Sequence, residues 1–165
     1  MEPNEHTRKT ACCFTGHRPE KLNMQEADLV SALETEILQA IADGFRIFLV
    51  GMARGTDIWA AETVVKLKHS GSPIYLVCAI PFDGFELRWS AAWQKRYTDV
   101  LRESDMVRYV CPRYERACFQ KRNVWMVDRS SRVIAVYNGR SGGTRNTLVY
   151  AKKQGVECRI IDDAG

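Results

Sequence analysis

The sequence has no apolar run that approaches the roughly 20 residues needed to cross a membrane. Its first residues, 1–10, are polar and charged, which does not suit a signal peptide. The six cysteines form no Cys-x-x-Cys pair and no Cys/His spacing that suits zinc. We therefore expect reduced thiols, a cytoplasmic location and neither a disulfide framework nor a metal site.

Strong positive charge is also absent. The net charge is +4, and the basic residues are interleaved with acidic ones instead of forming a stripe. Dedicated nucleic-acid-binding domains are usually more basic. The charge therefore argues against a nucleic-acid partner and is compatible with an anionic small molecule.

Short apolar runs alternate with longer stretches of helical spacing. Nearly continuous apolar runs, as expected for strands covered on both faces, occur at 11–15, 46–50, 74–79, 106–110, 133–137 and 158–161. Between them, helices are indicated by patterns such as Leu29, Leu33, Ile37 and Ile41. Trp89 and Trp93 begin another helical pattern, and further helices are expected at 115–128 and 144–154.

Alternation of strands and helices implies parallel pairing with right-handed crossovers. The 165 residues suit one domain of roughly 100–200 residues. We predict a single Rossmann-like three-layer α/β/α domain over 11–165, with a mostly parallel sheet and a frayed or disordered segment at 1–10. The strand order stays open.

Unusual residues gather where the expected strands end. In open parallel sheets, ligands bind outside the carboxyl ends of the strands, where the strand order reverses. The sequence therefore predicts a ligand site formed by Gly16, His17, Arg18, Gly51, Arg54, Gly55, Asp57, Pro81, Phe82, Trp89, Arg122, Asn123, Asn138, Gly139, Gly142, Gly143 and Thr144.

Two glycine loops carry the prediction. Gly139–Thr144 follows a strand and opens a helix, so its N–H groups and Thr144 hydroxyl suit a phosphate, although a tight turn with a Thr cap is an equal alternative. Gly51–Asp57 repeats the design without being a Walker A loop or a GxGxxG motif. Arg54 suits phosphate, and Asp57 suits a ribose hydroxyl or a helix cap. We expect the two loops to converge on one anion-sized hollow.

Each remaining candidate residue also suits an ordinary structural role. His17 suits general acid–base catalysis or a loop hydrogen bond, and Arg18 suits a phosphate or carboxylate clamp. Phe82 and Trp89 offer ring faces to a base but also suit a core. Polar groups on the fourth helix are ligand or structural candidates in equal measure: Arg122, Asn123 and Asp128.

These motifs together resemble a known family. The stretches 13–19 and 51–57, the residues Arg122-Asn123 with 126–128, and Gly142-Gly143-Thr144 are similar to the YpsA-like family of bacterial proteins. That family is similar to the SLOG superfamily, which groups Smf/DprA DNA-processing proteins with LOG-type phosphoribohydrolases. The resemblance covers roughly 11–161. It implies a Rossmann-like fold, a nucleotide-type ligand at the glycine loops, and a regulatory or sensing role that some relatives link to cell division.

One departure bears on catalysis. LOG-type hydrolases carry a Pro-Gly-Gly-x-Gly-Thr-x-x-Glu signature, whereas this chain reads Ser141 to Thr147 without the proline or the glutamate. The nearest carboxylate candidate is Glu62, for which a surface or structural role is the alternative. Whether the chain is an enzyme therefore stays open, with His17, Asp57 and Glu62 as the weak catalytic candidates.

Four functions compete. The leading hypothesis is a sensor of a nucleotide or nucleotide-derived ligand, including ADP-ribose or NAD-like molecules. The others are a nucleotide N-glycosidase, a single-stranded DNA-binding protein by analogy with DprA, and a protein-interaction module with a vestigial pocket. Homo-oligomers and protein partners stay open.

Overall fold

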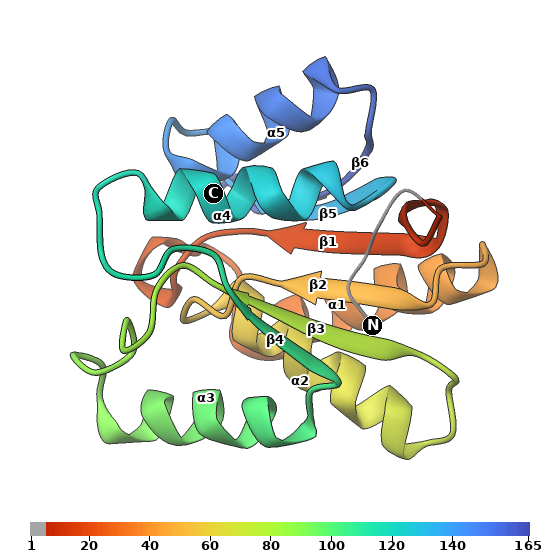
Figure 1. The fold of residues 1–165 in the computed structure, drawn as a ribbon. Coiled ribbons are helices and arrows are strands. Elements are labelled where there is room, and N and C mark those ends of the chain that lie inside the picture. The colour runs from red at the N-terminus through yellow and green to blue at the C-terminus, as the bar shows by residue number, and fades with distance from the viewer. Residues whose placement is uncertain (1–5) are drawn as a thin grey trace.

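Parallel strands form the middle layer of the structure. The computed structural model describes residues 6–165, and within them the sheet has six strands in the order β4-β3-β2-β1-β5-β6 (Figure 1). Every neighbouring pair is parallel. The strands are β1 (Ala11–Thr15), β2 (Ile47–Val50), β3 (Tyr75–Ile80), β4 (Met106–Tyr109), β5 (Arg132–Tyr137) and β6 (Glu157–Asp162).

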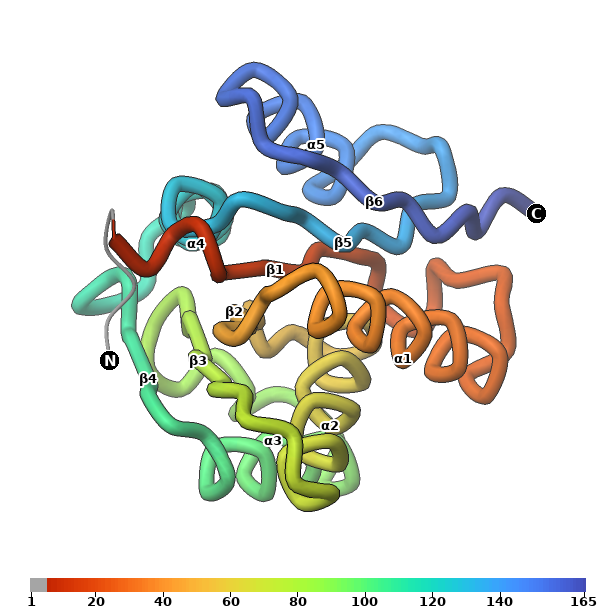
Figure 2. Tube along the Cα trace, turned by 90° about the vertical axis from the view of Figure 1, so that its right-hand side faces the viewer, coloured from red at the N-terminus to blue at the C-terminus, as the bar shows by residue number. Residues whose placement is uncertain are grey.

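Helices cover both faces of this sheet. On one face lie α1 (Glu26–Ala42), α2 (Thr56–His69) and α3 (Ala91–Glu103); on the other lie α4 (Cys118–Asp128) and α5 (Gly143–Lys153) (Figure 2). The predicted Rossmann-like three-layer α/β/α fold is confirmed. No helix within residues 6–165 combines the length and the apolar character that crossing a membrane demands.

Each central strand supplies both cores. In β1, Cys12 and Phe14 belong to the core under α1, α2 and α3, whereas Ala11 and Cys13 belong to the core under α4 and α5. Successive side chains of a strand point to opposite faces, so a strand between two helical layers is apolar at every position. This explains why the sequence shows continuous apolar runs there.

The expectation of two covered faces is wrong for the outermost strands. In β4, Val107 and Tyr109 are exposed, and in β6 Ile160 is exposed. The helical layers are narrower than the sheet, so its edges keep contact with solvent.

Most expected strand boundaries shift by at most one residue, and the larger differences lie at three places. The third helix begins at Ala91, after Trp89, because the Ser90 side chain caps it by accepting a hydrogen bond from the Trp93 N–H. The fourth helix begins at Cys118 instead of 115. Of the segment expected to be frayed, 1–5 lies outside the described residues, and Arg8–Thr10 forms a 3₁₀ helix. The carbonyl of Thr10 accepts a hydrogen bond from the Arg46 N–H.

The strand order creates a crevice at one place. The chain moves outward from β1 through β2 and β3 to β4, then returns to place β5 on the other side of β1. Ligands in open parallel sheets bind at such a reversal, outside the carboxyl ends of the strands. These ends and the starts of α4 and α5 lie on the left of Figure 1.

Close backbone packing joins the loop after β1 to the start of α2. A Cβ atom at Gly16 would collide with the Thr56 side chain, and one at Gly55 would lie 2.8 Å from the His17 carbonyl oxygen. Gly55 also has φ of +86°. Only glycine satisfies both conditions at Gly55, because it lacks the Cβ atom.

We expect Gly55→Ala to destabilise the fold more than Gly71→Ala. Gly71 has φ of +99°, but a Cβ atom there would have no other atom within 4 Å, so its substitution costs only the left-handed backbone, about 1–2 kcal/mol. Gly55→Ala adds a collision with backbone that cannot move aside. Urea unfolding of both variants measures the difference, and equal free energies of unfolding would contradict the packing argument.

Candidate functional site

A cavity of about 340 Å³ opens at the reversal of strand order. This volume lies at the lower end of the range of small-molecule sites, about 300–1,000 Å³. The structure brings eight of the predicted residues to its wall, from the loop after β1 and from α2, α4 and α5: Gly16, His17, Arg18, Asp57, Arg122, Asn123, Gly143 and Thr144.

The start of α5 presents unused hydrogen-bond donors to this cavity. The first hydrogen bond of the helix runs from the Asn146 N–H to the Gly142 carbonyl, and no side chain caps the helix. The N–H groups of Gly143, Thr144 and Arg145 therefore have no acceptor within residues 6–165. Such a helix end attracts anions through its free N–H groups and its partial positive charge.

Thr144 strengthens this end of the cavity. Its side chain is only 5% exposed and its hydroxyl makes no hydrogen bond to any described residue, whereas the Thr147 hydroxyl one turn later donates to the Gly143 carbonyl. The hydroxyl oxygen is not among the buried atoms that lack a partner, so it is reached from the cavity that Thr144 lines. Thr144 is thus placed to bond a ligand atom in the cavity.

Arg122 supplies a buried positive charge to the same wall. It is 6% exposed; its Nη1 donates to the Gly51 carbonyl, and its Nε donates to Asn123 Oδ1 at 2.9 Å. Burial lowers the pKa of Arg122, and the Asp57 carboxylate opposes that shift. An arginine stays protonated in proteins, so the cavity has a fixed cation beside the α5 N-terminus.

The second glycine loop is built differently from the first. At the start of α2, the Thr56 N–H donates to the His17 carbonyl and the Ile58 N–H donates to the Ala53 carbonyl. The Asp57 carboxylate accepts from the Ala53 N–H at 3.1 Å. These three donors are satisfied inside the protein, whereas the N–H groups of Arg54, Gly55 and Asp57 have no acceptor within residues 6–165. Both glycine loops therefore keep free N–H groups, and their convergence on one anion stays a prediction.

Two residues of that loop are also occupied by the protein. Arg54 forms a bidentate pair with Glu20, with an Nη2–Oε1 distance of 2.9 Å. A Cβ atom at Gly51 would lie 2.7 Å from Arg122 Nη1, so the space beside Gly51 holds the guanidinium and not a ligand. Asp57 does line the cavity, and burial raises its pKa.

His17 links the loops after β1 and β5. The Asn138 N–H donates to His17 Nε2 at 3.0 Å. A backbone N–H can only donate, so Nε2 is the unprotonated nitrogen and the ring is neutral. Burial lowers the pKa of His17, in agreement with that form. The loop hydrogen bond is thus the role that the geometry supports for His17.

A second hollow of about 300 Å³ adjoins the first across His17 and Lys21. Its wall includes the predicted residues Asn138 and Gly142, together with Arg140. The two hollows lie on either side of the loop before α5. An extended ligand with its phosphate at this loop would have room for one group in each hollow.

The aromatic candidates lie elsewhere. Phe82 packs edge-on against Phe85, Tyr114 and Phe119, and Trp89 packs against Phe85 and Tyr97. Two phenylalanines line the cavity: Phe14 is fully buried in β1, whereas Phe119 is exposed. Sequence reasoning missed Phe119, although Phe119, Arg122 and Asn123 have the i, i+3, i+4 spacing of one helix face.

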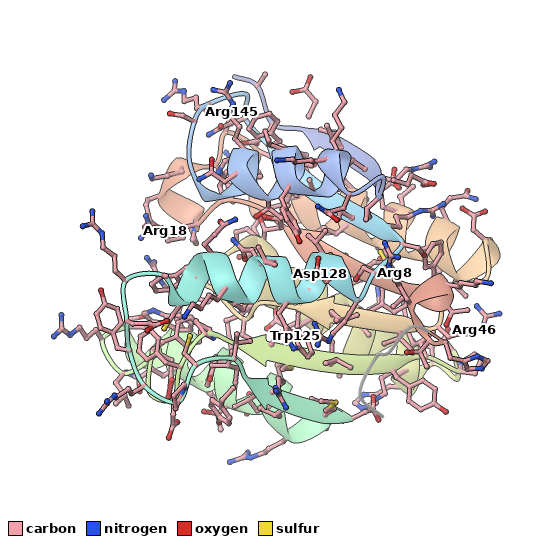
Figure 3. The ribbon with its side chains drawn as sticks, turned by 45° about the horizontal axis from the view of Figure 1, so that its top comes forward. Arg8, Arg18, Arg46, Trp125, Asp128 and Arg145 are labelled. Carbon is pink, nitrogen blue, oxygen red and sulfur yellow. The ribbon has the colours of Figure 1, made fainter. Side chains whose placement is uncertain are left out.

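Four further candidates do not line the main cavity. Glu62 forms a bidentate pair with Arg96 of α3, at 2.6 Å between Oε1 and Nη2. Asp128 ends α4 and accepts from the Tyr150 hydroxyl at 2.6 Å (Figure 3). Pro81 and Gly139 line neither hollow. The geometry supports structural roles for Glu62 and Asp128, since each has a partner of its own.

Basic side chains lie at the two hollows: Arg18 and Lys21 line the first, and Lys21 and Arg140 line the second. Arg18, Lys21, Arg140 and Arg145 are all exposed, and Arg18 and Arg145 lie at the same end of the molecule, near the start of α5 (Figure 3). Arg18 has one acidic neighbour, Glu20, at 3.9 Å. Lys21 lines both hollows, which the sequence did not indicate.

Comparison with known proteins supports this architecture. Residues 12–161 match the family model YpsA, described as the YspA SLOG family. A UPF0398 protein of Halalkalibacterium halodurans is 34% identical over 126 residues, which cover 74% of this chain and 67% of that protein. The SPbeta prophage-derived protein YoqJ of Bacillus subtilis is 37% identical over 118 residues, 64% of this chain and 69% of its own length.

Two solved structures share the fold. DNA processing protein A (DprA) from Streptococcus pneumoniae has a TM-score of 0.66 at 16% identity, over 93% of this chain and 50% of that chain. DprA from Helicobacter pylori has a TM-score of 0.63 at 14% identity, over 95% of this chain and 68% of that one. This chain therefore spans half of the Streptococcus protein, and the likeness concerns the fold alone.

His17 predicts a pH dependence of stability. Because burial lowers its pKa from the ordinary 6.5, the unfolded chain takes up a proton at a higher pH than the folded chain. The stability due to neutral His17 is complete above about pH 6.5 and is lost as the pH falls through the folded pKa. We expect the free energy of unfolding to fall less steeply in His17→Gln, whose amide oxygen can accept the Asn138 N–H.

Urea unfolding between about pH 8 and pH 5 measures this difference. His6 and His69 are present in both chains, so their titration cancels in the comparison. Identical pH profiles for the two chains would remove His17 as the neutral acceptor.

Proposed function

The chain belongs to the YspA SLOG family, and we propose that it binds a nucleotide or nucleotide-derived ligand through a phosphate at the start of α5. The observation that carries the proposal is the convergence of free N–H groups, the Thr144 hydroxyl and the Arg122 guanidinium on one cavity. The N–H groups and the Thr144 hydroxyl have no partner among the described residues, and the Arg122 guanidinium is a cation. A phosphate accepts hydrogen bonds from groups of both kinds.

The rest of the cavity suits a nucleoside. Phe119 offers an apolar ring at the wall, and the Asn123 side chain lies beside it on the same helix face. Base–aromatic stacking tolerates any base because every base has a π-face. The adjoining hollow at Asn138 and Arg140 would accommodate a second group, as in ADP-ribose or a dinucleotide. A sensing role follows from binding without an evident catalytic pair.

A panel measured by thermal shift tests the binding. It pairs adenosine with AMP, ADP and ADP-ribose, and adds NAD and inorganic phosphate. A ligand at about 100 times its Kd stabilises the fold by about 2.7 kcal/mol. We expect a shift with phosphorylated members and none with adenosine; equal shifts with adenosine and AMP would show that the phosphate is not what the site recognises.

Thr144→Val should weaken the binding of the best nucleotide about ten- to hundredfold. A hydrogen bond to a charged group contributes about 1.5–3 kcal/mol, and valine keeps the shape of threonine without its hydroxyl. Thr147→Val is the matched control, because the Thr147 hydroxyl is bonded to the Gly143 carbonyl. Isothermal titration reports both affinities, and an unchanged Kd in Thr144→Val would remove the hydroxyl from the site.

Single-stranded nucleic acid is the second candidate ligand. Arg18, Lys21 and Arg140 are exposed and line the two hollows. The Helicobacter pylori protein that shares the fold has a described single-stranded DNA binding mode. The low net charge is therefore a poor argument against nucleic acid, since phosphate contacts depend on local charge. An oligonucleotide added to the panel at low and moderate salt distinguishes this candidate.

Turnover would rest on one carboxyl group. Asp57 lines the cavity, and burial raises its pKa against the opposing effects of Arg122 and the Ala53 N–H. Glu62 is paired outside the cavity. Release of free base from a bound nucleotide, and its loss in Asp57→Asn, would support a hydrolase in place of a sensor.

A further inference from the structure

The loop between β4 and α4 gathers two thiols and a carboxylate. One ligand atom each from Cys111, Glu115 and Cys118 lies within 4.8 Å of the others. Cys111 follows β4 and Cys118 is the first residue of α4. Both thiols are buried, whereas Glu115 is exposed. In contrast, Cys12, Cys13 and Cys78 are buried within strands.

Hydrogen bonds hold both thiols close to Glu115. The Glu115 N–H donates to Cys118 Sγ at 3.1 Å, and such a bond stabilises a thiolate. The Cys118 thiol donates to the Arg113 carbonyl at 3.5 Å, and the Cys111 thiol donates to Glu115 Oε1 at 3.9 Å. A hydrogen bond with the Cys118 thiol raises the pKa of Cys111 to about 11.

We propose that Cys111, Glu115 and Cys118 bind Zn²⁺, with water as the fourth ligand. Thiolate and carboxylate ligands around a tetrahedral ion are typical of zinc. On binding, Zn²⁺ replaces the two thiol protons, which pass to solvent, and forms two Zn–S bonds and one Zn–O bond. No electron is transferred.

Charge balance supports the site. Two thiolates, one carboxylate and Zn²⁺ leave one negative charge, which the Lys121 ammonium offsets through its ion pair with Glu115. The complex with Lys121 is therefore neutral, so burial of its thiolates leaves no unpaired charge. A carboxylate has two oxygens, so Glu115 can bind the ion and keep Lys121.

The spacing explains why the sequence did not reveal the site. Cys-x₃-Glu-x₂-Cys contains neither a Cys-x-x-Cys pair nor histidine, so it escapes the usual zinc patterns. The ion would fix the loop that precedes α4, next to Phe119 but outside the cavity. Its detection is thus independent of any nucleotide.

Cobalt titration of the reduced, metal-free full chain tests the site. Co²⁺ gives thiolate-to-metal charge-transfer bands and tetrahedral d–d bands, and we expect one equivalent to bind and one equivalent of Zn²⁺ to displace it. In Cys111→Ser and in Cys118→Ser, the charge-transfer band should fall to half or less. Glu115 is exposed, so Glu115→Gln should leave the fold intact. This variant should keep the charge-transfer band, because both thiols remain. Its affinity for Zn²⁺, measured in competition with a chromophoric chelator, should fall at least tenfold.

Cys158→Ser is the matched control, since Cys158 is only partly buried and lies in β6, outside the cluster. It should leave the bands unchanged. Absence of charge-transfer bands in the unmodified chain, or bands that persist in Cys111→Ser/Cys118→Ser, would overturn the assignment. Circular dichroism of each variant separates loss of the ligand from loss of the fold.

The pH dependence of zinc affinity provides a second readout. Because two thiols must lose protons, the apparent affinity should rise up to about 100-fold per pH unit below the thiol pKa values. A site made of carboxylates alone would show no such rise above about pH 6. A flat profile there would therefore contradict thiolate ligation.

Discussion

The burial of the Arg122 guanidinium at the carboxyl edge of the sheet is the constraint on which the site depends. A buried charge needs partners that compensate its lost hydration. The Gly51 carbonyl and the Asn123 side chain supply them directly, and the Asp57 carboxylate supplies an opposite charge. Position 51 requires glycine, because the guanidinium occupies the space that a Cβ atom would need. The loop after β2 is therefore shaped around an arginine from a helix 71 residues later in the chain.

This constraint separates the roles of two loops that look alike in sequence. Both are glycine-rich and both connect a strand to a helix. The loop before α2 pairs the N–H groups of Ala53, Thr56 and Ile58 within the protein. The loop before α5 leaves the N–H groups of Gly143, Thr144 and Arg145 without an acceptor among the described residues. The loop before α2 is thus tied more closely to the rest of the protein than the loop before α5.

Helix α4 connects the two proposed binding sites. Its first residue, Cys118, belongs to the thiol cluster, and the next residue, Phe119, lines the cavity. Arg122 and Asn123 follow one turn later on the cavity wall. Any ligand that orders the start of α4 therefore acts on the same element that holds the buried cation. The family resemblance does not by itself indicate this link, because the link depends on contacts within the β4–α4 loop.

The sequence determined the fold class and pointed to the edge of the sheet where the candidate cavity lies. Strands buried on both faces need apolar residues at every position, and helices need a periodic stripe, so the pattern of β1 and α1 was readable directly. Glycines and hydroxyls after β1 and β5 marked the carboxyl edge for the same local reason. Only the tertiary structure decided which donors are free, because hydrogen bonds such as Thr56 to His17 and ion pairs such as Glu62 to Arg96 join residues 34 or more positions apart. Sequence patterns describe neighbours along the chain, whereas the availability of a polar group depends on neighbours in space.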